Sequence, residues 1–369
     1  MKIYFGNSFS TNVQYPEYDK EGHFCSAADW MIVALRKLGH DVDVGIQFDG
    51  SKRYDVLTQI LGNCSLSSKR FPIIPMLTWD WSVAESGRVK SLNKAEGMIS
   101  PSKFITQAYI NAGYPKTLTR TGQLGVDAEI YHPDTSPMKL KTTKRFKFFT
   151  FAHEQVYLVI SAFVEEFDKN DDVVLIFKGG GPLESDITTE CFQFIERLKK
   201  EKNNCPEILT IDKKMSAIQL ASLYTAVDCT IAKSIRSSGW GLMLNESMAC
   251  GIPVITSTYG AYGEFANEEN AFIVRHKEVE ANIPGSFISP PKWSEPDICH
   301  LKELMRYIIL HPEERNRKSK RALEDMRNKF TWQIAAEKFV KNIEELLGQR
   351  KFRVLRKKTF LFFSKFPGI

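Results

Sequence analysis

The sequence predicts an α/β protein built from two consecutive doubly wound domains. Three observations support this fold class. The 369 residues are enough for two domains of ~150 residues each. Strand and helix patterns alternate from the N-terminus, and the same alternation begins again after residue 144. Such alternation is typical of parallel sheets that are covered by helices.

The first predicted unit begins as a strand, a loop, a helix and a second strand. An apolar run at residues 3–5 predicts the first strand. Ser26, followed three residues later by Asp29, is a capping-box type of helix start, and Gly39 ends that helix. Residues 41–44 then predict the next strand, so the chain opens as a βαβ unit.

The second unit repeats this alternation and is followed by a long helical pattern. Strands are predicted at 144–151, 171–178, 228–232 and 252–257, and helices at 156–167, 215–226, 242–250 and 331–348. Between the two units, the segment 131–144 is polar and contains two prolines. This composition suits a connection between domains.

The positive charge of the chain is concentrated at its C-terminus. The formal net charge is +6, from 50 Lys+Arg and 44 Asp+Glu. Residues 348–369 hold seven Lys and Arg and no carboxylate, so this tail alone carries +7 and the other 347 residues carry −1. A nucleic-acid partner is therefore disfavoured, because its basic surface would have to extend over the body of the protein.

The cysteines and the hydropathy pattern predict a cytoplasmic protein. The seven cysteines are odd in number, have no CxxC spacing and lie near no histidine cluster. They indicate buried thiols in a reducing compartment and no zinc site. Neither a signal peptide nor an apolar run of ~18 residues is evident.

The stretch 228–264 carries the most chemical information. A strand ends in Ser and Gly residues, and a helix begins at about Leu242, so the free N–H groups of its first turn can bind a phosphate. Glu246 lies one turn further on, where a carboxylate can accept hydrogen bonds from the hydroxyls of an attached sugar. The alternative is an ordinary βαβ unit with a solvated glutamate.

Residues 238–254 read SGWGLMLNESMACGIPV and resemble the donor site of GT-B glycosyltransferases of family 4, whose pattern is approximately EGFGLPLLEAMACGVPV. Further stretches resemble that family in the same order along the chain: 35–44 (LRKLGHDVDV), 100–115 (SPSKFITQAYINAGYP), 124–133 (LGVDAEIYHP), 175–182 (LIFKGGGP) and 330–343 (FTWQIAAEKFVKNI). The resemblance covers residues 1 to about 347.

This resemblance implies a GT-B fold, with two Rossmann-like domains facing a cleft and a C-terminal helix that crosses back to the first domain. The implied parts are an acceptor-side domain (1–140), a nucleotide-sugar donor domain (145–330), the crossover helix (331–347) and the basic aromatic tail (348–369). It also implies transfer of a hexose from a UDP- or GDP-linked sugar to a hydroxyl of a glycan, lipid-linked or protein-linked acceptor. Anomeric configuration would be retained, without a metal or another cofactor.

Only one of the family's two paired glutamates is present. The resemblance assigns ribose binding to Glu246, but the position of the first glutamate is Ser238, which cannot offer charge to a developing oxocarbenium ion. The Arg/Lys pair that holds the diphosphate in the family is also missing, and His153, Glu154 and Gln155 stand in that loop.

Charge on the departing diphosphate must then be compensated from elsewhere, because electrostatic stabilisation is commonly the largest catalytic contribution. Lys233 and Lys178 are the first candidates, with Arg236 and the helix start at Gly241 and Leu242 beside them. Each cation has the alternative of a solvated loop residue.

In the first domain, Asp80 is the candidate acidic residue of the cleft, with the alternative of a loop carboxylate between two packed tryptophans. The predicted catalytic residues are Asp80, Ser238 and Lys233. The predicted donor-binding residues are Glu246, Gly239, Gly241, Leu242, Met243, Lys178, Gly179, Gly180, Arg236, His153 and Gly22.

Two other functions, and two roles for the tail, are compared with this prediction. The chain could be a non-catalytic or weakened nucleotide-sugar-binding protein, because two expected charged features are absent. A dinucleotide oxidoreductase is disfavoured, because the first loop has no GxGxxG spacing.

The tail mixes seven cations with five phenylalanines. This composition fits either peripheral contact of residues 350–369 with anionic lipid or a helix packed on the first domain.

Overall fold

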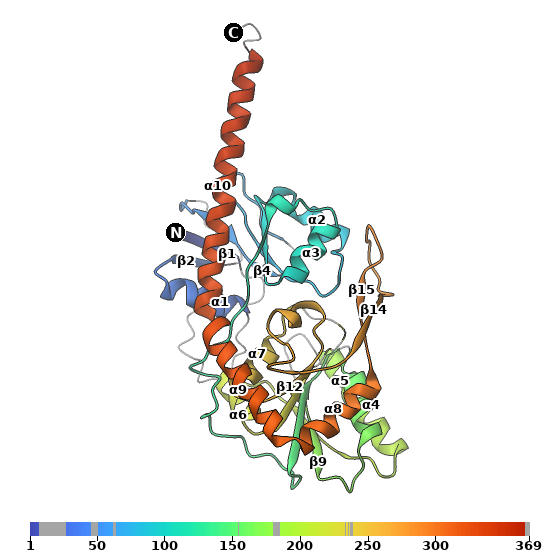
Figure 1. The fold of residues 1–369 in the computed structure, drawn as a ribbon. Helices are drawn as coiled ribbons and strands as arrows, with labels where there is room; N and C mark the ends of the chain where they lie inside the picture. The colour runs from blue at the N-terminus through green and yellow to red at the C-terminus, as the bar shows by residue number, and fades with distance from the viewer. Residues whose placement is uncertain are drawn as a thin grey trace.

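The computed structural model describes residues 1–6, 27–45, 51–61, 64–153, 155–179, 185–232, 234, 236 and 239–365. These residues form two α/β halves that lie one above the other in Figure 1. The long helix α10 (Trp332–Lys365) starts between the halves, runs along the upper one and projects beyond it. We call residues up to 140 the N-terminal half and residues 145–330 the C-terminal half. Gly22, Ser26, Glu154, Gly180, Lys233 and Ser238, all named in the sequence analysis, lie outside the described residues.

The sheets of the N-terminal half are entirely parallel. β1 pairs with β2 on one side and β3 on the other, and β4 follows β3 after a single residue and continues the pairing through β5, β6 and β7. The strands are β1 (Lys2–Gly6), β2 (Asp41–Gly45), β3 (Val56–Thr58), β4 (Ile60–Leu61), β5 (Met76–Leu77), β6 (Met98–Ser100) and β7 (Thr119–Thr121). The helices are α1 (Ala27–Lys37), α2 (Ser86–Ser91) and α3 (Lys103–Asn111), with 3-10 turns η1 (Leu92–Lys94) and η2 (Lys116–Leu118).

The C-terminal half holds a six-stranded parallel sheet of order β10-β9-β8-β11-β12-β13. Its strands are β8 (Phe146–Phe151), β9 (Val173–Gly179), β10 (Glu207–Asp212), β11 (Cys229–Ile231), β12 (Val254–Thr256) and β13 (Phe272–Ile273). Its helices are α4 (Tyr157–Glu166), α5 (Ser185–Glu201), α6 (Ala217–Tyr224), α7 (Leu242–Ala249), α8 (Ile298–Leu310) and α9 (Pro312–Lys329), with the 3-10 turn η3 (Gly260–Glu264).

Strand order places a binding position in this sheet. The chain winds from β8 outward through β9 to β10 and then returns to the other side of β8 with β11. In doubly wound sheets, ligands bind outside the carboxyl ends of the strands at such a reversal. The carboxyl ends of β8 and β11 are therefore where a ligand site is expected. All seven residues of β9 are buried, as expected for a parallel strand covered on both faces.

The helix α10 joins the halves on one side. Gly125 lies against its start, where an added Cβ would be 2.3 Å from the Trp332 nitrogen, and Val126 N–H donates to Phe330 O at 2.8 Å. Packing of α10 on α1 carries the chain back to the N-terminal half (Figure 1). The expected crossover is present, but the helix continues without a break beyond its expected end at residue 347.

An antiparallel hairpin joins the halves on the other side, and the sequence patterns did not predict it. It consists of β14 (His276–Glu280) and β15 (Lys292–Pro296) and reaches from the C-terminal half toward α2 and α3 (Figure 1). We call residues 276–296 the hairpin.

Most other expected elements are confirmed with small shifts at their ends. The helix expected after Ser26 is α1, and Gly39 has a φ of 83° just after it, which suits a glycine C-cap. The strands and helices expected between residues 144 and 257 correspond to β8, α4, β9, α6, β11, α7 and β12. Four of the six described cysteines are buried and all six are free thiols.

Candidate functional site

Side chains from the loops after β8 and β11 meet at the strand-order reversal. The Ser234 hydroxyl donates to Gln155 Oε1 at 2.6 Å, which ties the two loops together. His153 is partly buried beside them, and its Nδ1 accepts from the Gln155 N–H at 3.2 Å. The bond between Gln155 and Ser234 joins residues 79 positions apart, so no local pattern in the sequence indicates it.

The start of α7 follows this pair. Its N-cap, Gly241, has a φ of 98°, and an added Cβ would be 2.3 Å from Tyr262 Cε1, so both backbone conformation and space require glycine here. Leu242 and Met243 begin the helix and are partly exposed. The N-cap offers no side-chain oxygen to the first turn, whose N–H groups and helix dipole suit an anion.

Glu246 lies one turn into α7 and is held by two phenols. Tyr224 OH donates to Glu246 Oε2 at 2.9 Å, and Tyr131 OH makes a second hydrogen bond to the carboxylate. Burial raises the pKa of Glu246 to about 7, although both hydrogen bonds oppose the increase. We call Tyr131 and Tyr224 the phenol pair. The sequence patterns did not single out either residue.

The phenol pair comes from different parts of the fold. Tyr224 ends α6 and is fully buried, while Tyr131 lies in the segment that leaves the N-terminal half. Their rings are 6.1 Å apart and pack edge to face. Burial, then the nearby Glu246 carboxylate, raises the pKa of Tyr224 well above its ordinary value, so it remains a hydrogen-bond donor.

Gly239 brings the loop before α7 into contact with the N-terminal half. A Cβ added to it would be 3.1 Å from Asp80 Oδ1 and 3.2 Å from the Trp79 carbonyl oxygen. Asp80 is exposed, whereas Trp79 is buried and packs edge to face on Trp81 at 4.8 Å. Two predicted site residues from opposite halves, Asp80 and Gly239, are therefore adjacent.

Lys178 and Gly179 end β9, next to β8. Lys178 is only 5% exposed, and its ammonium donates to the Gly179 carbonyl. A Cβ on Gly179 would be 2.4 Å from Thr188 Cγ2, so this glycine allows α5 to pack closely on the strand. Contact of either residue with a nucleotide stays a prediction.

Arg236 has partners on the hairpin. Its guanidinium forms an ion pair with Glu295 at 3.0 Å and stacks on the Trp293 ring at 4.5 Å. Its predicted contact with a diphosphate is therefore in competition with a protein carboxylate.

Two further observations bear on the chemistry. Within the described ranges, no group of three or more His, Cys, Asp or Glu side chains could hold a metal ion. In the described part of the chain, no helix is long and apolar enough to cross a membrane.

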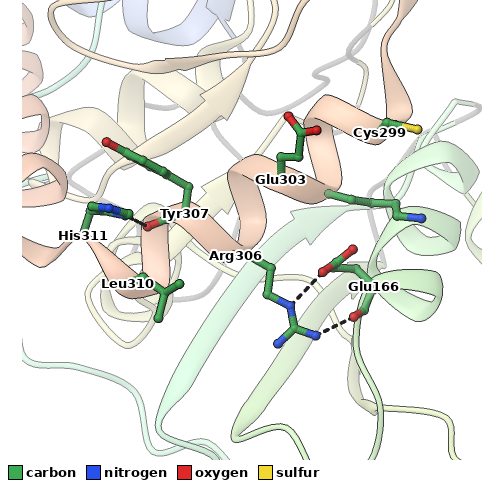
Figure 2. Close-up of a pocket in the computed structure, with 8 residues that line it drawn as sticks. Glu166, Cys299, Glu303, Arg306, Tyr307, Leu310 and His311 are labelled. Carbon is green, nitrogen blue, oxygen red and sulfur yellow. Dashed lines mark hydrogen bonds and ion pairs between the residues drawn. The ribbon is translucent and has the colours of Figure 1, made fainter.

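A hollow of about 500 Å³ lies elsewhere, on the outer side of α8 (Figure 2). Arg306, one of the residues that line it, is paired with Glu166 at 2.7 Å and with Asp171 at 2.8 Å. Both carboxylates precede β9, so the hollow is at the amino edge of the sheet, opposite the candidate site. It therefore does not contribute to that site.

The chain resembles glycosyltransferases in part of its sequence and in its fold. Residues 150–283 match the family described as Glycosyl transferases group 1. No curated protein matches the chain. The structure is similar to that of HepE from Anabaena in complex with UDP and glucose, with a TM-score of 0.65 and 16% identity over 93% of this chain and 99% of that chain.

Two other solved structures have the same architecture. Sucrose-phosphate synthase from Thermosynechococcus elongatus has a TM-score of 0.63 and 15% identity, over 87% of this chain and 92% of that chain. A glycosyltransferase from Rickettsia africae has a TM-score of 0.65 and 13% identity, over 94% of this chain and 98% of that chain. The predicted fold class is thus confirmed: the chain is a mixed α/β protein with the GT-B fold.

Proposed function

We propose that this protein is a retaining glycosyltransferase that moves a hexose from a nucleoside diphosphate-sugar to a hydroxyl acceptor. The observation that carries the proposal is the position of Glu246, held by the phenol pair one turn into α7, next to the strand-order reversal. The glycosyltransferase match of residues 150–283 includes this helix.

Glu246 would bind the ribose of the donor. An ionised carboxylate that accepts from two phenols still has lone pairs for two sugar hydroxyls. The N–H groups at Leu242 and Met243 would bind the diphosphate through the helix start. We propose UDP as the nucleotide, with GDP as the alternative, because HepE was solved with UDP-glucose.

The protein would position donor and acceptor and stabilise the charge of the leaving group, and no side chain would act as a nucleophile. The bond between the sugar C1 and the phosphate oxygen breaks, and a bond between C1 and the acceptor oxygen forms on the same face. The acceptor proton moves to the departing phosphate oxygen, and the nucleoside diphosphate leaves. Lys178, Lys233 and the start of α7 would stabilise the charge of the leaving group, without a metal. Asp80 and Ser238 would contact the sugar or the acceptor.

The second candidate is a nucleotide-sugar-binding protein with weak or no transfer activity. It is favoured by the residues found where the family has charged ones, since His153 and Gln155 replace the Arg/Lys pair and Ser238 replaces the first glutamate. Both candidates require donor binding at Glu246, so turnover separates them.

The test is a thermal-shift screen with UDP-, GDP-, ADP- and dTDP-sugars on the wild type, Glu246→Ala and the control Glu324→Ala. Glu324 is an exposed carboxylate on α9. One nucleotide should raise the melting temperature of the wild type and the control but not of Glu246→Ala. Equal shifts in all three proteins would remove Glu246 as the ribose ligand. Release of free nucleotide with acceptors of each class then distinguishes transfer from binding alone.

We further propose that the tail contacts an anionic membrane surface, where a lipid-linked acceptor would be available. The support is its charge of +7 and its five phenylalanines, together with a helix that continues to Lys365 and projects from the body (Figure 1). Deletion of residues 351–369 should abolish co-sedimentation with phosphatidylglycerol vesicles. Equal sedimentation of the full and truncated chains would contradict the proposal.

A further inference from the structure

The loop that precedes α7 is fastened to the hairpin through Arg236. Arg236 O accepts from the Ser294 N–H at 2.9 Å, so the main chains are also joined. The guanidinium is paired with Glu295, lies over the Trp293 ring, and has only 19% of its side chain exposed. Three consecutive hairpin residues therefore hold one loop residue.

The hairpin is itself fastened to the N-terminal half. Its Lys292 N–H donates to Ser82 Oγ at 2.7 Å, and its carbonyl accepts from the Ser82 N–H at 3.3 Å. Nearer the tip, the Ser86 N–H donates to Ser286 O at 2.8 Å. Phe287 packs in the apolar cluster of the N-terminal half, 6.4 Å from the Trp79 ring.

These contacts form a continuous connection from the loop to the opposite half. Arg236 joins the loop to β15, the hairpin joins Ser82 and Trp79, and Trp79 is adjacent to Gly239, three residues after Arg236. The series of contacts therefore starts at Arg236 and returns to the same stretch of chain at Gly239, where Gly239 lies next to Asp80. Arg236 is thus held by the hairpin, which contacts the N-terminal half, and Gly239 lies directly against that half.

We propose that Arg236 is a positioning residue, which holds its own position in the chain ahead of α7 against the N-terminal half through the hairpin and does not bind the donor diphosphate. The carboxylate of Glu295 already neutralises the guanidinium charge, so Arg236 would attract a diphosphate only weakly. Moving Arg236 away to bind a diphosphate would also expose the Trp293 ring. The expected effect on kcat/KM rests on the proposed function. The contacts between Arg236 and the hairpin can be tested without a donor.

The test compares Arg236→Ala, Glu295→Gln and the double variant. If Arg236 acts through Glu295, both single variants lower kcat/KM for transfer by a similar factor of about three to ten, and the double variant is no worse than either. The Kd for UDP changes less than about twofold. Arg275→Ala is the control, because it removes a charge from an exposed pair with Asp297 at the hairpin base.

A direct diphosphate contact would give a different result. Arg236→Ala would then raise the Kd for UDP at least about tenfold, while Glu295→Gln would leave or improve it. That outcome would overturn the inference.

Hydrogen exchange gives a readout that needs no donor. Both single variants should increase exchange in peptides covering 232–240 and 276–296, and the control should not. Unchanged exchange would overturn the inference even if transfer falls. If no nucleotide binds at all, the proposed function fails and the exchange result alone decides whether Arg236 fastens the loop.

Discussion

Glu246→Gln should stabilise the protein at alkaline pH, because burial makes the ionised carboxylate unfavourable. The folded pKa of Glu246 is about 7, compared with 4.5 when exposed. The folded protein therefore holds this proton to a higher pH than the unfolded chain does, and the free energy of unfolding falls as pH rises from about 4.5 to about 7. A shift of this size corresponds to about 3 kcal/mol.

The neutral amide introduced by Glu246→Gln would not bear this cost. We expect wild type and variant to have similar stability near pH 4.5, and the variant to be about 3 kcal/mol more stable at pH 8. For a chain of this length, that difference corresponds to a melting temperature about 4 °C higher. Urea unfolding at pH 5, 6, 7 and 8 measures it, with Glu324→Gln on α9 as control.

A variant that is equally stable at pH 8, or one whose advantage is the same at every pH, would refute the reasoning. The first result would mean that the carboxylate is well solvated in the folded protein. The second would mean that the amide improves packing or hydrogen bonding independently of ionisation.

Three other substitutions test the geometry of the site and of the fold. Tyr224→Phe removes a hydroxyl that donates to Glu246, so the Kd for UDP should rise about tenfold in titration calorimetry, and an unchanged Kd would argue against the phenol pair. Gly239→Ala should lower the free energy of unfolding by about 1–3 kcal/mol, since its Cβ would be 3.2 Å from the backbone carbonyl oxygen of Trp79. As a control, Gly87→Ala adds a Cβ that meets nothing within 4 Å and lies in helix α2, so it should be neutral or stabilise by up to about 1 kcal/mol. Gly125→Ala places a Cβ 2.3 Å from the first backbone nitrogen of α10 and should cost about 3 kcal/mol or more in urea unfolding, so near-native stability would contradict this close approach.

The parts of the fold that depend on local sequence were predictable. Helix α1 carries its own start and stop signals, and β9 is a continuous apolar run that ends in glycines. The ordered match at residues 238–254 placed Glu246 on α7, because the spacing between a loop and a helix is fixed along the chain.

The parts that depend on distant contacts were not predictable. Tyr131 and Tyr224 look like ordinary core aromatics in the sequence, and only folding brings their hydroxyls to Glu246, across 115 and 22 residues. Arg236 looks like a free loop cation because Glu295, its partner, lies 59 residues later. The hairpin was also not predicted, because its strands are mostly polar and its position depends on hydrogen bonds with the N-terminal half.

The phenol pair would explain how the partly buried Glu246 carboxylate could act as the proposed ribose ligand near neutral pH. Without these two hydrogen bonds, burial would raise the pKa of Glu246 further, and the protonated acid could not accept from two ribose hydroxyls. A lysine or arginine partner would lower the pKa more effectively, but it would hold the carboxylate in an ion pair and compete with the sugar. Neutral donors give part of the stabilisation and leave oxygen lone pairs available. Donor affinity should therefore increase as pH rises through about 7, and it should do so while the folded protein becomes less stable.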